Sequence, residues 1–531
     1  MTSELVKAFN ALPRKETAPS DEELNEWHFD LRYMQLEPNP SHIITLIQPQ
    51  SQIIHIERLP VGLPTNQSGI EYFPESAKEA APEVAKAFLH AFVNNIGQST
   101  TTNAPPAFAP WKLTTEDKDL ASAVSDELKR IGVRPLELCT ITLSKTQTNR
   151  IMQKAFTRLF ANLKTAAGYT GTGSAAITTP QPFTFWNFKP DPQEMSPRRR
   201  SQSTDESDEV KRVNLALRYI ETWTNSRPPD PSQVDSKSFM PQVKRELEVL
   251  LKVLDKRPEG KVKADADAGD ADAALDYGLR LSVGLCCTRD RPKSRVYFIK
   301  AILSPGASDK TKATAHGALI YWHLYSLRTD LQSRYVQAAC HHANIAARLC
   351  RMINPPSTHV TPAILEFMHH VLKRMAKNVP ELCLLYKDAV DGYKDRNKQV
   401  AEEREKMQAK RLKNPQRYRC AAVGCGIEAD TGKMLSKCTT SLFFLRPSGP
   451  VLTTGECSVI DDGTYDAGPM ESVGGVIQVP ITHNGSTVFV SSSTMDVKRL
   501  KEMKAMVEGW AQRFPLGVQM GLRWSLTLSV A

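Results

Sequence analysis

Apolar residues in the first part of the chain follow strand and helix periodicities in turn. Two β-branched runs separated by Pro and Ser predict a strand pair. The apolar stripes that follow recur at helical spacing, and one of them ends at Asn94, Asn95 and Gly97. These elements predict a layered α/β module over residues 1–166. In order they are strands at 43–47 and 53–56, a helix within 76–97, a helix at 114–132, a strand at 136–143 and a helix at 147–163.

The periodicity stops between residues 167 and 209, where Gly, Thr, Pro and Ser dominate and clustered charges follow. Such a segment has too little apolar area to form a core, so we expect a disordered linker. The glycine-rich stretch at 168–176 lacks the Lys and the following Ser or Thr of a phosphate-binding loop. We therefore interpret it as part of the linker.

Small residues recur at matched positions in the helical segments of residues 210–400. One predicted hairpin pairs 273–285 with 297–303, and a second, about 39 residues later, pairs 315–324 with 336–349. Small side chains such as Gly278 and Gly317 let neighbouring helices approach closely.

A third, less regular pair is predicted at 364–375 and 382–393. The region as a whole resembles tetratricopeptide-like and related helical-repeat arrays. That resemblance implies binding of a protein or peptide partner on a concave face.

An aspartate-rich tract, KADADAGDADAALD, precedes the first hairpin. Its alternate carboxylates invite a calcium-loop interpretation, but such a loop needs glycine at its sixth position and a closing Glu. Here Gly269 is fifth and Asp276 is twelfth. We therefore expect a flexible tract whose last aspartate caps the next helix.

Composition places the chain among ordinary multidomain proteins. It has 531 residues, 41% of them hydrophobic and 24% charged, which excludes collagenous, wholly disordered and membrane-dominated classes. The net charge of +10 is spread over the chain, and the dense basic stretches at 198–200 and 406–413 are short. This distribution does not favour a nucleic-acid partner.

The hydropathy of the first residues and the cysteine usage predict an intracellular protein. The first residues lack the continuous apolar core of a signal peptide, and no stretch has eighteen apolar residues without charges. We expect no membrane partner, and a location in the cytoplasm or nucleus. The 10 cysteines are irregularly spaced, which favours reduced thiols or metal ligands over a disulfide framework.

Three cysteines near residue 430 have a spacing typical of zinc sites. Cys420 and Cys425 are separated by four residues, and Cys438 follows a glycine-containing turn. This segment, RYRCAAVGCGIEADTGKMLSKC, resembles the opening half of a MYND-type zinc finger as found in large fungal proteins that join such a finger to helical regions. The resemblance implies zinc binding and recognition of short proline-containing peptides.

The second half of that finger is absent from this chain. Members of the family use seven cysteines and one histidine for two zinc ions, whereas only Cys457 and His483 remain downstream here. Residues 439–456 have the character of sequence inserted by a mispredicted exon boundary or a retained intron. Alternatively, Cys420, Cys425, Cys438 and Cys457 form one closed all-cysteine zinc site, because four thiolates satisfy tetrahedral zinc.

The remaining chemistry does not assemble into a catalytic motif. Adjacent histidines such as His341–His342 and His369–His370 point about 100° apart on a helix, so neither pair chelates one ion. No nucleophile elbow, zinc-protease helix or kinase signature is present. We therefore expect no enzyme.

The sequence predicts an intracellular interaction or scaffold protein with a partial MYND-type segment. The alternatives are a lysine methyltransferase, as in some proteins with this finger, or a transcriptional regulator. The expected architecture is a multidomain α+β chain whose oligomeric state is open. In order it has the α/β module at 1–166, the linker at 167–209, helical hairpin repeats at 210–400, a charged helix and the zinc-finger-like segment at 401–460, and a strand and helix tail at 461–531.

Overall fold

Strand β2 (Ser41–Ile47) is buried along its whole length because apolar side chains leave it on both faces. Ile44 and Leu46 belong to the core formed with helix α2 (Ala77–His90). Ile43 and Ile47 pack instead against helix α4 (Thr146–Ala166). The alternation therefore places a helical layer on each side of the sheet.

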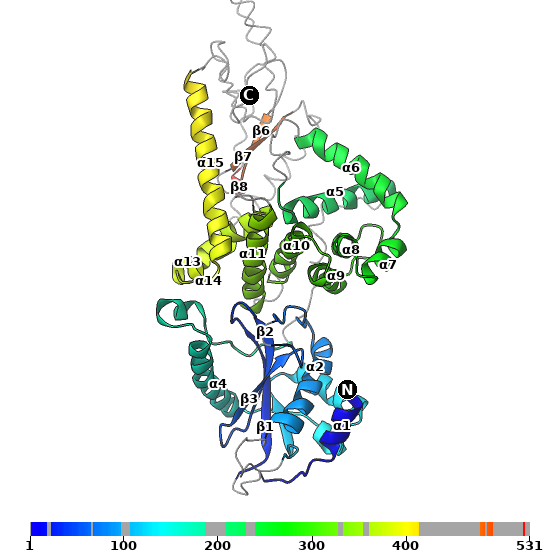
Figure 1. Ribbon diagram of the computed structural model, residues 1–531, viewed down its shortest axis with the longest axis vertical. Coiled ribbons are helices and arrows are strands. Elements are labelled where there is room, and N and C mark those ends of the chain that lie inside the picture. The colour runs from blue at the N-terminus through cyan, green and yellow to red at the C-terminus, as the bar shows by residue number, and fades with distance from the viewer. Residues whose placement is uncertain are drawn as a thin grey trace, which may run out of the picture. The chain divides into compact units, whose positions relative to one another are not determined.

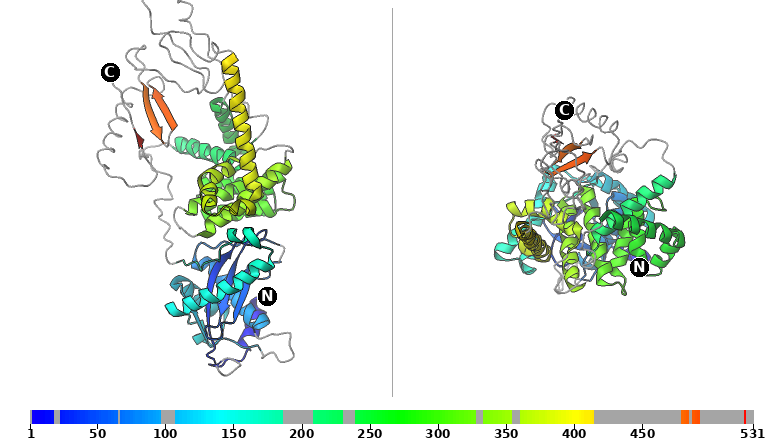
Figure 2. Two further views of the ribbon diagram at one scale, coloured as in Figure 1. Left: turned by 90° about the vertical axis from the view of Figure 1, so that its left-hand side faces the viewer. Right: turned by 90° about the horizontal axis from the view of Figure 1, so that it is seen from above.

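The sheet of this computed structural model is mixed and five-stranded, in the order β3-β2-β1-β4-β5. β2 pairs antiparallel with both β1 and β3, and β4 pairs parallel with β1 and β5. Figures 1 and 2 show α4 on one face and α1 and α2 on the other. The strands other than β2 are β1 (Glu26–Met34), β3 (Ile54–Leu59), β4 (Lys112–Thr115) and β5 (Thr142–Leu143), and the remaining helices of this part are α1 (Thr2–Asn10), the π-helical η1 (Ala91–Asn95), α3 (Lys118–Ile131) and the 3₁₀ turns η2 (Leu136–Cys139) and η3 (Gly171–Ala176).

The structure describes most of the chain up to residue 413 and little beyond it. The described residues are 2–17, 23–64, 67–96, 107–185, 208–229, 239–327, 333–353, 360–413, 478–483, 486–491 and 524–525.

Three parts of the sheet differ from the sequence-based expectation. Thr114 and Thr115, expected to begin a helix, are the last residues of strand β4, and α3 begins after its cap Asp117. The strand pair at 43–47 and 53–56 is confirmed as β2 and β3. Strand β1 was not predicted because its buried side chains include His28, Asp30 and Arg32. The strand expected at 136–143 is instead the turn η2 followed by the two-residue β5.

Residues 167–185, which we expected in a disordered linker, are packed against the sheet. Ile177 is buried with α4, and Phe183 and Phe185 are buried in the core of the α2 face. The Lys164 ammonium donates to the carbonyls of Ser174 and Ile177, at 2.9 and 3.1 Å. These contacts compensate for the low apolar content of the stretch, and residues 186–207 of the expected linker lie outside the described residues.

The middle of the chain is helical. Helices α8 and α9 pack together, as do α10 and α11, which matches the two predicted hairpins. Gly278 lies against Phe298, and Gly317 against the backbone of Ser226, so the small residues do permit close helix approach. The helices are α5 (Asp208–Ser226), α6 (Phe239–Lys256), α7 (Glu259–Asp267), α8 (Ala271–Val283), α9 (Arg291–Leu303), α10 (Asp309–Leu327), α11 (Ser333–Ile353), α12 (Pro362–Phe367), the π-helical η5 (Met368–Leu372), α13 (Lys373–Asn378), α14 (Leu382–Leu385) and α15 (Lys387–Lys413).

The aspartate-rich tract is helical rather than flexible. Asp267 ends α7 and pairs with the Lys300 ammonium at 2.6 Å. Asp270 caps α8 by accepting from the backbone amides of Asp272 and Ala273, so the cap is an earlier aspartate than expected. These carboxylates serve helix ends and ion pairs.

The α/β module and the helices up to Arg396 form one unit, and residues 397–531 form another. Within the first unit, Tyr33 and Phe73 of the α/β module are part of the core of the helical region. Arg334 of α11 donates to the carbonyl oxygen of Pro74 at 2.8 Å. A shared core therefore joins these two parts of the chain.

The second unit has a small antiparallel sheet in the order β7-β6-β8. β6 (Gln478–His483), β7 (Ser486–Ser491) and β8 (Trp524–Ser525) lie in the tail for which strand and helix were expected. The rest of that tail lies outside the described residues. Among the helices that are described, none has the length and apolar character needed to cross a membrane.

The contact at Gly317 yields a stability prediction. A Cβ at this position would lie 2.2 Å from the carbonyl oxygen of Ser226, which is backbone and cannot rotate away. We expect Gly317→Ala to lower the free energy of unfolding by about 1–3 kcal/mol, measured by denaturant titration of the full chain. Gly306→Ala is the control, because nothing lies within 4 Å of its Cβ position. Equal stability of the two variants would contradict the close approach of α5 and α10.

Candidate functional site

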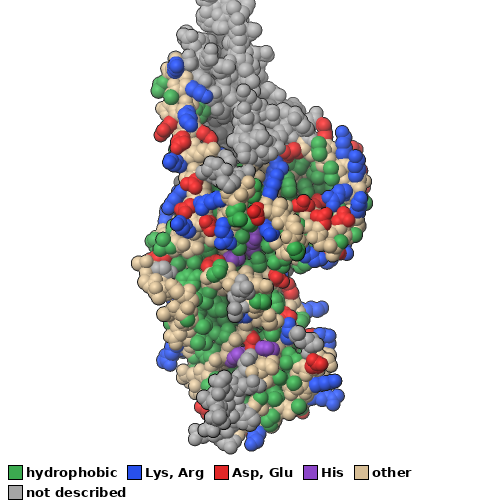
Figure 3. All heavy atoms as spheres, viewed as in Figure 1, with side chains coloured by type: hydrophobic (Ala, Val, Ile, Leu, Met, Phe, Trp, Pro, Cys, Tyr) green, Lys and Arg blue, Asp and Glu red, His purple; other side chains and the backbone are tan. Residues whose placement is uncertain are grey.

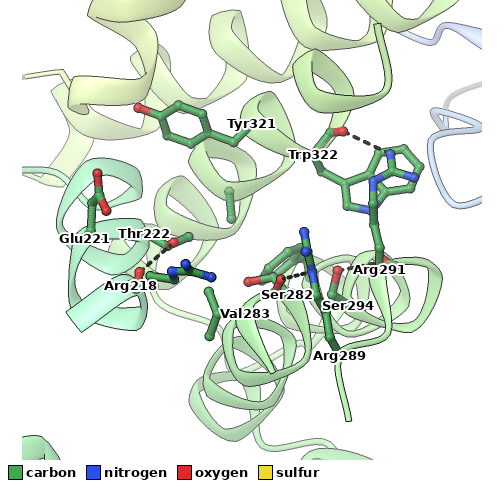
Figure 4. Close-up of a pocket in the computed structure, with 12 residues that line it drawn as sticks. Arg218, Glu221, Thr222, Ser282, Val283, Arg289, Arg291, Ser294, Tyr321 and Trp322 are labelled. Atoms are coloured by element: carbon green, nitrogen blue, oxygen red, sulfur yellow. Dashed lines mark hydrogen bonds between the residues drawn. The ribbon is translucent and has the colours of Figure 1, made fainter. Parts of the chain in front are cut away.

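A hollow of about 320 Å³ opens between helices α5, α8, α9 and α10 (Figure 4). We call it the basic groove, because its described lining includes three arginines and one glutamate. The apolar part of its lining, which we call the floor, comprises Val283, Phe298 and Ala318. The lining residues are Arg218, Glu221, Thr222, Ser282, Val283, Arg289, Arg291, Ser294, Phe298, Ala318, Tyr321 and Trp322.

Local sequence signals place the walls of the groove. Gly317 lets α5 approach α10, which brings Arg218 beside the hollow. Gly284 adopts a left-handed conformation, with φ of 84°, and ends α8. Asp290 then caps α9 by accepting from the Lys293 amide, so the short connection sets Arg289 at the rim.

Arg291 belongs to the wall of the groove rather than to its free surface. Its guanidinium lies over the ring of Trp322, with 3.8 Å between the guanidinium carbon and the ring centroid. It also donates to the carboxylate of Glu75 at 2.6 Å and to the carbonyl oxygen of Trp322 at 3.1 Å. The positive charge of Arg291 is therefore compensated, and one face of the indole is covered.

Arg218 and Arg289 are the exposed cations of the groove. Figure 4 shows Arg218 extending from α5 towards the hollow, with Arg289 on the opposite side. The Nε of Arg289 donates to the carbonyl oxygen of Ser282 at 3.0 Å, which orients its guanidinium. Among the described residues, no hydrogen bond or ion pair involves the Arg218 side chain.

The aromatic residues at the upper side of the groove are already engaged. The Tyr321 hydroxyl donates to the Glu366 carboxylate at 2.6 Å. Burial raises the pKa of Tyr321, and so does this hydrogen bond, so the phenol stays protonated. The groove thus offers guanidinium donors above an apolar floor, an arrangement suited to binding an anionic group next to an apolar one.

The sequence-predicted metal ligands are not among the residues that form this site. Cys420, Cys425, Cys438 and Cys457 all lie outside the described residues. Within the described ranges, no group of three or more His, Cys, Asp or Glu side chains is arranged to hold a metal ion. His369 and His370 are exposed on η5, whereas His341 and His342 are buried on α11.

The buried histidines gather where α10 and α11 meet the α/β module. His316 and His342 face each other, with 2.9 Å between their Nδ1 atoms, and the rings of His323 and His342 stack. Burial lowers the pKa of His316 to about 3. Burial also lowers the pKa values of His42, His323 and His342, and the neighbouring arginines or histidines lower them further. We call His42, His316, His323 and His342 the histidine cluster.

Charged groups from both parts of the first unit surround the histidine cluster. Arg295 and Arg334 come from the helices, and Glu75 comes from the segment before α2. Within the described residues, the Nδ1 atoms of His42 and His323 are buried without a hydrogen-bond partner. A protonated imidazole here would be desolvated beside arginines, so the cluster is built for neutral rings.

Searches against protein families, curated proteins and solved structures return no match to this chain.

The groove was not expected from the sequence. The closest signal was the basic run RDRPK at residues 289–293, directly before α9.

The histidine cluster predicts loss of stability in acid. Unfolded histidines titrate near pH 6.5, whereas the folded cluster titrates lower, so the unfolded chain binds more protons below about pH 6.5. The free energy of unfolding should fall as the pH drops from about 6.5 towards 3, where His316 itself titrates. Each such histidine contributes up to about 1.4 kcal/mol per pH unit.

Denaturant titrations of the full chain at about pH 7.5, 6.5 and 5.5 measure this effect. His316→Gln should flatten the dependence, and His370→Gln, at an exposed position, should leave it unchanged. A free energy of unfolding that stays constant across this range would contradict a cluster of neutral imidazoles.

Proposed function

We propose that this chain is an intracellular interaction or scaffold protein that binds an extended segment of a partner protein in the basic groove. The observation that supports the proposal is the groove itself, which lies between helices of two neighbouring hairpins. In this proposal the hairpins act as a tetratricopeptide-like array, whose stacked helices form a surface for a peptide. A partner's side chain would rest on the apolar floor while its backbone follows the rim.

The distribution of charge favours a protein partner over nucleic acid. On the face shown in Figure 3, Lys and Arg side chains of the described residues alternate with Asp and Glu side chains. Nucleic-acid binding draws on many cations along one track, because each phosphate contact adds to affinity. The groove instead presents two exposed cations within one hollow, a scale that suits a single side chain.

The cysteine-rich segment supplies a second element of the proposal. We propose that Cys420, Cys425, Cys438 and Cys457 bind one zinc ion and present a small MYND-like docking surface. Thiolate ligation would make the metal part of the folding energy of that segment. Two separate binding elements in one chain are what a scaffold requires.

Filling the groove tests the principal proposal. Thr222 lines the groove from α5, and its hydroxyl contacts only the carbonyl oxygen of Arg218 one turn earlier among the described residues. We expect Thr222→Trp to weaken binding of short synthetic peptides from a random-sequence array by about tenfold or more. The indole would occupy the space that a bound side chain needs.

Thr224→Trp is the matched control for this experiment. Residues two apart on a helix point about 200° apart, so the same bulk is added away from the groove. Peptides selected with the unchanged protein should bind this variant within about twofold. If every selected peptide binds Thr222→Trp as tightly as the unchanged protein, the groove is not the binding site.

Metal content tests the zinc-binding element. We expect about one zinc ion per purified chain by elemental mass spectrometry, and loss of that zinc in the Cys420→Ser/Cys425→Ser variant. Cys286→Ser is the control, because Cys286 is an exposed cysteine between α8 and α9. Equal zinc content in both variants would show that these cysteines do not bind the metal.

A further inference from the structure

The basic groove has a charge pattern that selects among peptides. Its exposed cations, Arg218 and Arg289, come from α5 and from the turn before α9, on opposite sides of the hollow. Between them lies the half-buried side chain of Val283, and Phe298 and Ala318 of the same lining are almost fully buried. A ligand that enters the groove therefore meets guanidinium groups from two directions and a hydrocarbon surface beneath.

A cationic ligand is disfavoured in this groove. Aromatic rings can bind a cation over their faces, and Trp322 would be the best candidate here. That ring is already covered by Arg291, at 3.8 Å, and approached by Arg295, at 5.5 Å. A lysine or methyl-lysine side chain would have to displace Arg291 from Glu75 and would meet three arginines.

An anionic ligand complements the same residues. Guanidinium groups bind carboxylates through paired, charge-assisted hydrogen bonds, and an approach from two sides fixes the position of the anion. Glu221 is the carboxylate among the described lining residues, and it lies on α5 next to Thr222. Its charge opposes an anion, so the groove retains a moderate rather than an extreme preference.

We infer that the partner segment is acidic, and that the groove binds an Asp or Glu side chain between Arg218 and Arg289 while a neighbouring apolar side chain of the same peptide rests on Val283. This inference rests on the proposed function, since it specifies the chemistry of the segment that the groove binds. Arg291 acts as a positioning residue that holds the wall through Glu75 and Trp322.

Three fluorescein-labelled peptides test the inference with the full-length protein. They share one sequence that alternates leucine with a variable residue, and that residue is Asp, Asn or Lys. We expect the Asp peptide to bind about tenfold more tightly than the Asn peptide in a fluorescence anisotropy titration, and the Lys peptide to bind most weakly. Raising the salt concentration from about 0.05 to 0.5 M should reduce the advantage of the Asp peptide.

Variants that each remove one charge test whether the preference for the Asp peptide arises in the groove. Arg218→Gln and Arg289→Gln should each weaken the Asp peptide about fivefold and change the Asn peptide by less than about twofold. Glu221→Gln should tighten the Asp peptide about threefold, because it removes a like charge. Arg212→Gln is the matched control, since Arg212 lies on the same helix, is paired with Asp255 and does not line the groove.

The outcomes separate this inference from the proposed function. If Asp and Asn peptides bind equally and Thr222→Trp weakens both, the groove binds peptides without charge selection, and the inference is overturned alone. If no peptide responds to Thr222→Trp, the proposed function also fails. A phosphoserine peptide or a single-stranded oligonucleotide that binds more than about tenfold tighter than the Asp peptide would replace the carboxylate by a phosphate and overturn the inference.

Discussion

The carboxylate of Glu75 connects the α/β module to helices α9 and α11 within the first unit. It accepts a hydrogen bond from Arg291 of α9 at 2.6 Å and another from the hydroxyl of Tyr335 of α11 at 3.1 Å. Glu75 is nearly buried, so leaving it without these donors would cost several times what a surface ion pair contributes. The contact therefore defines how the helices meet the segment that precedes α2.

The same contact shapes the basic groove. Because Glu75 compensates the charge of Arg291, that guanidinium can lie flat on Trp322 and act as wall rather than as ligand. The exposed charge of the groove is then carried by Arg218 and Arg289. A site with three equivalent cations would attract any polyanion, whereas two opposed ones suit a single acidic group. The preference we propose is thus a consequence of how the wall is built.

The sequence predicted those elements whose side chains match their surroundings, with apolar residues where the chain is buried and small residues where helices approach closely. The apolar strand β2 follows from its β-branched run, and the close helix approaches at Gly278 and Gly317 follow from matched small residues. Strand β1 was not predicted, because it buries polar side chains whose hydrogen-bond partners are far away in the sequence. Arg32 pairs with Asp30, donates to Gln153 and the carbonyl oxygen of Pro180 at 2.8 Å each, and lies over Phe156.

The groove was not predicted for a similar reason, because its residues come from helices α5, α8, α9 and α10 and from the turn before α9. Arg218 and Arg289 are ordinary exposed arginines in sequence, and only the packing of α5 against α10 brings them to opposite sides of one hollow. Residues 167–185 show the opposite error. Their composition suggests a tether, but Phe183, Phe185 and Ile177 are enough to bind the segment to the sheet. A few large side chains outweigh a majority of small polar ones when the core has room for them.

The histidine cluster and the basic groove are physically linked through α10. Trp322 faces the groove and His323, the next residue, faces the cluster, with 4.9 Å between their ring centroids. Phe73 of the α/β module contacts both rings, at 6.1 and 4.7 Å. Protonation of the histidine cluster would place positive charge near Arg291 and Arg334. Arg291 is part of the wall of the basic groove, and Arg334 is part of the contact with the α/β module. In the proposed mode of binding, the wall of the groove therefore rests on the same aromatic contacts that enclose the neutral imidazoles.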